Sequence, residues 1–379
     1  MPLVLNEEQR MFKDTAKTFF TENAPVEALR KLRDSKDATG YSTALWQQMV
    51  ELGLAGITIP EAYGGLAFGF LGLGAVMEES GRNLSASPLF STVVLGASAI
   101  ELAGSEGQKD ALLPAIASGE KTLALAIDEG NHHQPKNIAL SATKTDEGYV
   151  LSGSKAFVLD GHSADLLIIA ARTDGNKGDT GGLSLFLVDP SSNGITRSRR
   201  IMADSRNVAQ IDLDHVKVSP ESLLGEENHA WPVLEQVLDR GRAAIAAEML
   251  GGTLECFERT LEYLKEREQF GVKIGSFQAL KHRAAQMYAD IEMTKSAVMD
   301  ALTAVDENRP DSAQAVSLAK TRVNDVFTHV TNEAVQMHGG IGVTDELEIG
   351  FFLKRSRVAN QILGDASYHR DRYASLNGF

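Results

Sequence analysis

The run Arg267–Gly271, which reads REQFG, carries the residue types in this 379-residue chain that most directly suggest chemistry. It stands at the end of a long helical pattern, and Phe277 and Gln278 follow it. An arginine at a helix end, followed by a turn that contains glycine, can hold a pyrophosphate through two parallel hydrogen bonds. Taken alone, the run fits a solvated helix end that stops at glycine better, so its meaning depends on the rest of the chain.

Other groups that could do chemistry have simpler explanations. Gly339–Gly342 follows a helical pattern rather than a strand, and its spacing does not match a dinucleotide-binding turn. His132 and His133 are adjacent, so their side chains diverge on regular structure, and we interpret them as part of a solvated loop. Cys256 lies in the apolar face of a helical pattern, and a single cysteine excludes a disulfide framework and a multi-cysteine metal site. We therefore predict no metal site.

Composition narrows the class of protein. The chain carries 37 lysines and arginines against 51 acidic residues, a net charge of −14, which argues against nucleic acid as a partner. A hydrophobic fraction of 43% with 23% charged residues is typical of globular proteins. The apolar runs are shorter than the ~20 residues that a membrane span needs. The N-terminus lacks the pattern of a secretory signal, so we expect a cytoplasmic protein without a membrane span.

The hydrophobic period of the sequence, which indicates the elements that position these residues, changes twice along the chain. Residues 6–119 follow a helical period, and Asn6 with Gln9 is typical of a capping box that starts a helix. Residues 120–225 follow a strand period, with a hairpin signal at Asp146–Gly148 and continuous apolar runs at Leu166–Ala170 and Leu183–Val188. From residue 226 onward three long helical stripes return, interrupted at residues 271–277. The order predicts an α+β, mostly α protein in which a compact β domain separates two helical regions.

Five runs, in order along the chain, resemble motifs of the acyl-CoA dehydrogenase family. They are Ile59–Gly65, Gly153–Gly161, Leu224–Glu226, Arg267–Gly271 and Gln336–Gly342. The resemblance extends over essentially the whole chain, from the first helix to the last. The resemblance implies an N-terminal helical domain at residues 1–119, a middle β-barrel-like domain at 120–225 and a C-terminal four-helix bundle at 226–379. It also implies a tetrameric flavoprotein in which FAD lies between the middle and C-terminal domains and reaches a neighbouring subunit.

The resemblance assigns cofactor contacts residue by residue. Arg267 would bind the FAD pyrophosphate and Phe270 the adenosine side, with Gln278 in the same segment. Gln336, Gly339 and Gly340 would contact the FAD of a neighbouring chain, the glycines allowing close approach of the backbone. Phe157 matches the aromatic position that covers one flavin face, and its alternative is a core residue of the β domain. Two departures are Leu159, where relatives often carry a hydroxyl, and Asp128–Gly130, a faint version of the flavin loop.

Family chemistry removes the α-proton of an acyl-CoA thioester while the β-hydrogen leaves as hydride to the flavin. A backbone N–H and a hydroxyl of FAD polarise the carbonyl, and a glutamate acts as the base. In this chain the usual base position is Leu363, and the second position that some members use is Gly241. Neither can accept a proton, although the backbone N–H of Leu363 could still polarise a carbonyl.

Three interpretations follow from the missing base. In the first, the chain is the small subunit of a heteromeric acyl-CoA dehydrogenase, and a sister chain supplies the glutamate. In the second, it is a self-sufficient enzyme whose base has moved to Asp239 or Asp365, although a surface carboxylate and a helix N-cap are their simpler roles. In the third, it is a structural subunit without turnover.

The resemblance also predicts the partners. They are an acyl-CoA substrate, to which we assign Arg242 as a contact, and copies of the chain or a second acyl-CoA dehydrogenase chain in a heterotetramer. Electron-transfer flavoprotein is the expected electron acceptor. Fatty acid or steroid catabolism is the expected setting, and nothing in the sequence selects the acyl group.

Overall fold

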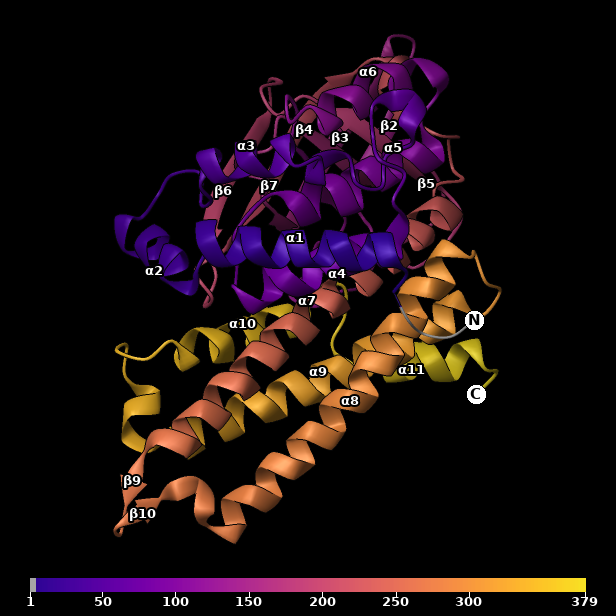
Figure 1. Cartoon of the computed structure of the whole chain (residues 1–379). Helices are drawn as coiled ribbons and strands as arrows, with labels where there is room; N and C mark the ends of the chain where they lie inside the picture. Colours follow the sequence, from indigo (N-terminus) through magenta and orange to yellow (C-terminus); the bar gives the residue numbers. More distant parts are fainter. Residues whose placement is uncertain (1–4) are drawn as a thin grey trace. The chain divides into compact units, whose positions relative to one another are not determined.

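The computed structural model describes residues 5–379 (Figure 1). The chain divides into two compact units. One unit combines residues 5–31 with Phe70–Ser85 and Arg242–Phe379. The other combines Leu32–Gly69 with Ala86–Gly241. The predicted order of helices, strands and helices is confirmed. The domain boundaries placed after residues 119 and 225 divide the sequence differently from these units and stay predictions.

Helices build the first unit. They are α1 (Glu7–Asn23), α4 (Gly69–Arg82), most of α7 (Trp231–Glu266), α8 (Gln278–Asp306), α9 (Ser312–His338), α10 (Ile349–Gln361) and α11 (Ala366–Leu376), with α2 (Val26–Ser35) ending outside it. The long helices α8 and α9 pack along each other (Figure 1). Between α7 and α8 the chain forms a small hairpin, β9 (Glu268–Gln269) and β10 (Val272–Lys273), at the predicted interruption of the helical stripes.

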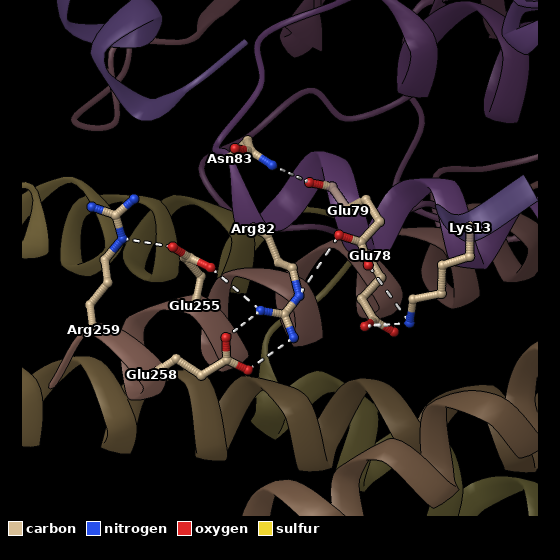
Figure 2. A network of polar contacts seen from close by, with 8 residues as sticks. All are labelled: Lys13, Glu78, Glu79, Arg82, Asn83, Glu255, Glu258 and Arg259. Carbon is tan, nitrogen blue, oxygen red and sulfur yellow. Dashed lines mark hydrogen bonds and ion pairs between the residues drawn. The ribbon is translucent and has the colours of Figure 1, made fainter. Parts of the chain in front are cut away.

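Glycines let α4 and α7 approach until their backbones touch. A Cβ atom added to Gly81 would lie 1.9 Å from the carbonyl oxygen of Glu248, and one added to Gly251 would lie 1.8 Å from that of Glu78. Charged side chains line this crossing (Figure 2). Arg82 of α4 donates to both carboxylate oxygens of Glu258 on α7, at 2.8 and 3.1 Å. Close backbone contact and ion pairs therefore fasten α4 to the C-terminal helices.

The second unit contains the β structure. Its helices are α3 (Thr43–Glu51), α5 (Ser98–Ala103), α6 (Glu106–Ala117) and a π-helical segment, Leu89–Ala97. Its strands are β1 (Leu123–Ala126), β2 (Ser141–Thr145), β3 (Gly148–Leu159), β4 (Leu166–Arg172), β5 (Leu183–Val188), β6 (Ile195–Ile201), β7 (Asn207–Val218) and β8 (Leu223–Leu224). The sheet order is β6-β7-β3-β2-β4-β5-β8, and β1 pairs in parallel with β4.

The local patterns that predicted these elements hold in the structure. Thr145 pairs with Gly148, so β2 and β3 form the predicted hairpin across Asp146 and Glu147. Strand β5 has the bounds of the second apolar run. Asn6 and Gln9 form the predicted capping box at the start of α1. Among the residues that the structure describes, no helix is long and apolar enough to cross a membrane.

Candidate functional site

The hairpin after α7 presents an aromatic side chain on a tight turn. Phe270 and Gly271 link β9 to β10, and both have a positive φ, of 54° and 78°. Two such residues make the turn type whose twist suits a two-residue hairpin, and the first place usually takes asparagine, aspartate or glycine. Phenylalanine is an unfavourable choice there, because its Cβ crowds the backbone. The Phe270 side chain is 92% exposed and meets Phe277 edge-on, with ring centroids 6.2 Å apart.

Arg267 and Gln278 flank this hairpin. Both side chains are exposed, and neither makes a hydrogen bond or ion pair with the residues that the structure describes. The backbone of Arg267 is fixed, since its N–H bonds the carbonyl of Tyr263 and its carbonyl accepts from Ile274 N–H, each at 2.9 Å. A fixed backbone with an unpaired guanidinium is suited to bind an anion.

The C-terminal end of α9 holds the next predicted residues. Gln336 is exposed on the last turn, and the helix ends at His338. Gly339 has φ 64° and ψ −144°, which favours glycine. A Cβ atom added to Gly339 or Gly340 would meet nothing within 4 Å, so the backbone there is open to close approach. The His338 ring stacks on Tyr263 at 4.2 Å between centroids, which joins this end of α9 to α7.

In the second unit, Phe157 lies at an irregularity of β3. The pairing of β3 with β7 shifts between Lys155 and Val158, and Phe157 has φ 55°. Its side chain is 36% exposed and is not part of the buried cluster that forms the core of the sheet. The alternative of a core residue is therefore wrong for Phe157.

A buried ion pair supports the strand beside Phe157. Lys155 is fully buried, and its Nζ donates to Glu129 Oε1 at 2.8 Å and to the carbonyl of Ile127 at 2.9 Å. The Glu129 carboxylate also accepts from the backbone N–H groups of Ala139 and Leu140, at 2.8 and 2.9 Å. Burial lowers the pKa of Lys155 to about 8, against the opposing effect of Glu129. The run Asp128–Gly130 is thus tied firmly to β3.

The loop Ile362–Gly364, between α10 and α11, carries Leu363, the predicted base position. Leu363 is buried and has φ 56°. Its carbonyl oxygen accepts from Arg242 Nε at 3.2 Å and from His369 Nε2 at 3.0 Å, the histidine being the donor in this pairing. Arg242 is also buried, and its guanidinium donates to the Tyr368 hydroxyl at 3.0 Å. Arg242 therefore holds the loop, and its contact with substrate stays a prediction.

Of the two candidate carboxylates, one caps a helix and the other is buried. Asp365 caps α11, because its side chain accepts from the backbone N–H of Tyr368 at 2.8 Å. Asp239 lies on α7 near Gly241, the second predicted base position, and is only 7% exposed. The simpler role of a surface carboxylate is therefore wrong for Asp239.

The remaining reactive side chains have structural roles. His133 Nδ1 lies 2.8 Å from Asp128 Oδ2, and no cluster of potential metal ligands occurs within residues 5–379. Burial raises the pKa of the Cys256 thiol, which makes thiolate chemistry unfavourable.

Backbone strain marks three of the predicted positions. Phe157, Phe270 and Leu363 all have a positive φ, near 55°. For such residues the left-handed conformation costs roughly 1–2 kcal/mol each, and observed strain of this kind concentrates at functional sites. Spacing along the sequence did not reveal this shared feature.

Sequence reasoning missed the groups that support these positions, chiefly Lys155, Lys320 and His369. Lys320 offered a signal, since it falls between the apolar residues Val316 and Val323 on one helical stripe. A lysine on an apolar face is rarely fully buried unless it is paired. The sequence alone could therefore have marked Lys320 as a buried residue with hydrogen-bond partners. His369 carried no comparable pattern.

Known proteins resemble the chain over its whole length. Models of the acyl-CoA dehydrogenase N-terminal, middle and C-terminal domains match residues 6–120, 128–216 and 228–375. The probable acyl-CoA dehydrogenase YngJ of Bacillus subtilis is 30% identical over 365 residues, 94% of either chain.

Two solved structures are similar in both sequence and fold. A chain of the Tcur3481–Tcur3483 steroid acyl-CoA dehydrogenase, solved as a variant, is 31% identical with a TM-score of 0.88 over 98% of each chain. A chain of the ChsE4–ChsE5 complex from Mycobacterium tuberculosis is 26% identical with a TM-score of 0.90 over 100% of each chain. Together with the three domain matches, these similarities show that the chain belongs to the acyl-CoA dehydrogenase family of FAD-dependent oxidoreductases that act on CH–CH groups.

Proposed function

We propose that the chain is a subunit of an acyl-CoA dehydrogenase and that a sister chain supplies the catalytic base. The observation that carries the proposal is the loop Ile362–Gly364, which is held in place by Arg242 and His369 although its base position is Leu363. A leucine cannot accept the α-proton. The loop has kept a fixed shape without the side chain that the reaction needs.

Residues of the chain fit FAD in their chemistry. The unpaired guanidinium of Arg267 suits the pyrophosphate, with the exposed Phe270 and Gln278 beside it. Gln336 is exposed, and the open backbone at Gly339 and Gly340 admits close approach of a ligand. Phe157 offers an exposed aromatic face that suits a flavin ring. When bound, FAD would accept the β-hydrogen of the acyl chain as hydride.

The chain's own contribution to the reaction would be electrostatic. The N–H of Leu363 has no hydrogen-bond partner among residues 5–379 and is suited to bind a thioester carbonyl oxygen. Such a bond stabilises the negative charge that develops on that oxygen as the α-proton leaves. The proton would go to a carboxylate of the sister chain, the β-hydrogen would leave with its electron pair, and a double bond would form between the α- and β-carbons.

The names of similar proteins support a two-chain assembly. The ChsE4–ChsE5 and Tcur3481–Tcur3483 structures are named as pairs of chains, and the second is named a steroid enzyme. We propose the same type of pairing here, with a steroid or fatty acyl thioester as the substrate class and electron-transfer flavoprotein as the acceptor.

Co-expression tests the pairing. The chain would be produced alone and with a neighbouring-gene homologue that has glutamate at the position of Leu363, then measured for size, FAD content and bleaching of the flavin by acyl-CoA thioesters. Activity that occurs only in the mixture supports the proposal. An active homotetramer with one FAD per chain overturns it.

The alternatives are distinguished by the same samples. A self-sufficient enzyme with a relocated base would bleach its flavin without the second chain, and Asp239 or Asp365 would then be its candidate base. A structural subunit would purify without flavin and would lack activity in either sample. Asp365 is already engaged as a helix cap, which makes it the weaker of the two candidates.

A further inference from the structure

A fully buried lysine lies against the loop that carries Leu363. Lys320 Nζ on α9 donates to Asn324 Oδ1 at 2.8 Å and to the carbonyl oxygens of Ala359 and Gly364, each at 3.2 Å. In its charged form Lys320 has three hydrogens, one for each of these acceptors. Burial and the neighbouring guanidinium groups of Arg242 and Arg355 lower the pKa of Lys320 well below its usual range, and Asp365 opposes this effect.

The acceptors of Lys320 stand at the two ends of the loop. Ala359 is in the last turn of α10, where backbone carbonyls begin to lack helical partners, and Gly364 closes the loop. Between them, His369 and Arg242 bind the carbonyl of Leu363. The carbonyls of Ala359, Leu363 and Gly364 are therefore all bound by buried side chains.

One backbone N–H group of the loop has no hydrogen-bond acceptor among the described residues. Ile362 N–H donates to the Ala359 carbonyl at 3.2 Å, and Gly364 N–H donates to the Gln361 carbonyl at 3.4 Å. Leu363 N–H, between them, has no acceptor in the described part of the chain. A buried backbone donor without a partner is rare, because the loss of its bond to water is not compensated. An acceptor from outside the chain would satisfy this donor.

We propose that Lys320 and His369 are positioning residues that fix the loop Ile362–Gly364 so that Leu363 N–H is kept for a substrate carbonyl. The inference rests on the proposed function, because it takes the acceptor to be an acyl-CoA thioester. Both side chains are fully buried, so they would act on the loop rather than on the substrate. Lys320 sets the two ends of the loop, and His369 holds the Leu363 carbonyl, which keeps the residue in its left-handed conformation.

Hydrogen exchange tests the positioning without any ligand. The variants are Lys320→Met, which keeps most of the length of the side chain without its donors, and His369→Phe, with His369→Gln as the conservative partner. We expect exchange in the segment 359–366 to rise about tenfold or more in the first two variants and to return toward the original rate in His369→Gln. Arg82→Met is the matched control, since the bonds of Arg82 go to Glu255 and Glu258 and not to the loop (Figure 2).

The carbonyl itself gives a second readout. FAD-loaded protein, with its sister chain, would be mixed with trans-2-enoyl-CoA thioesters labelled with carbon-13 at the carbonyl, and the C=O stretching frequency would be recorded. We expect a downward shift on binding that is reduced by about half or more in Lys320→Met and His369→Phe and kept in Arg82→Met. A general loss of stability would not change this frequency in bound, folded protein.

The outcomes separate the two proposals. Unchanged exchange in the segment 359–366 and an unchanged carbonyl shift in folded Lys320→Met and His369→Phe overturn the positioning role. If no thioester binds the unaltered protein, the proposed function fails, while the exchange experiment still decides whether the two residues fix the loop. If Lys320→Met does not fold, Asn324→Ala, which removes one acceptor of Lys320, replaces it with a smaller expected effect.

Discussion

Arg242 and Leu363 lie 121 positions apart in the chain, yet Arg242 Nε donates a 3.2 Å hydrogen bond to the Leu363 carbonyl oxygen. The guanidinium is buried and also meets Tyr368, both through its hydroxyl and from above the ring at 5.4 Å. A buried cation is costly unless hydrogen bonds satisfy it. Arg242 therefore stabilises the conformation of the loop between α10 and α11.

The bond from Arg242 fixes the backbone at Leu363, the predicted base position. A loop that had lost its role would be free to relax, because a leucine in the left-handed region is strained. The structure instead keeps Leu363 in that conformation under two side-chain donors. At Leu363, the predicted base position, the backbone conformation is therefore fixed although the side chain carries no carboxylate.

The first prediction restores the carboxylate. Leu363→Glu should raise dehydrogenation by the FAD-loaded chain alone by about 10²–10⁴-fold, the usual contribution of a general base. Bleaching of the flavin by saturated acyl-CoA thioesters measures it. Leu363→Gln, which has the same shape without a base, is the control and should stay inactive. If Gly241→Glu gives the gain and Leu363→Glu does not, the base belongs on α7.

The architecture could be predicted from the sequence because the spacing of apolar residues is a local property. The helical stripes, the Asn6 capping box and the hairpin at Asp146–Gly148 depend on residues a few positions apart, and all three were confirmed. Residue type alone drew attention to the run that contains Arg267 and Phe270, but only the family's motifs assigned FAD contacts to Arg267, Phe270 and Gln278. Their roles stay predictions.

The partners of the supporting residues could not be predicted for the opposite reason. Lys320 binds carbonyls 39 and 44 positions away, and Lys155 binds Glu129 26 positions away. No period relates such distant partners, so only the packed structure identifies them. The same holds for Asp239, whose burial depends on packing rather than on its neighbours in the sequence.

The second prediction concerns the cofactor. Arg267→Ala should remove a charge-assisted contact of about 1.5–3 kcal/mol with FAD, which lowers affinity roughly 10- to 150-fold. The FAD content after dialysis and the dissociation constant measure the loss. Lys265→Ala is the control, because Lys265 is a nearby exposed cation that pairs with Glu262 at 2.6 Å. Equal FAD retention in both variants would remove Arg267 from the site.

The third prediction separates the two roles of Asp365. Asp365→Ala should lower the free energy of unfolding by about 0.5–2 kcal/mol, because the N-cap of α11 is lost. Asp365→Ser keeps a capping oxygen without a carboxylate, so it should preserve both stability and the activity of the assembled enzyme. Urea unfolding and turnover measure the two effects. A stable Asp365→Ser variant with at least a hundredfold lower turnover would identify Asp365 as the relocated base.

The fourth prediction tests the crossing of α4 and α7. Gly251→Ala would place a Cβ atom 1.8 Å from the Glu78 carbonyl oxygen, so the two backbones must separate. We expect a loss of about 1–3 kcal/mol or more in stability, as in other overpacked sites. The control is Gly350→Ala on α10, where the added atom meets nothing within 4 Å and should raise stability by about 0.5–1 kcal/mol. Thermal unfolding of the two variants should move in opposite directions.

The fifth prediction is a pH dependence of stability that arises from His369. Burial lowers the pKa of His369, and Arg242, Lys320 and Arg372 lower it further, with the bond to Leu363 as the opposing effect. The unfolded chain therefore takes up a proton on this residue near pH 6.5, while the folded chain does not. The stabilisation from a neutral His369 is complete above that pH and is lost progressively as the pH falls below it, by up to about 1.4 kcal/mol per pH unit.

His162 and His338, whose pKa values are also lowered by burial, add to the slope. Urea unfolding between pH 5 and 7.5 should show a shallower slope for His369→Gln than for the unaltered chain, and identical slopes would mean that His369 titrates normally in the folded protein.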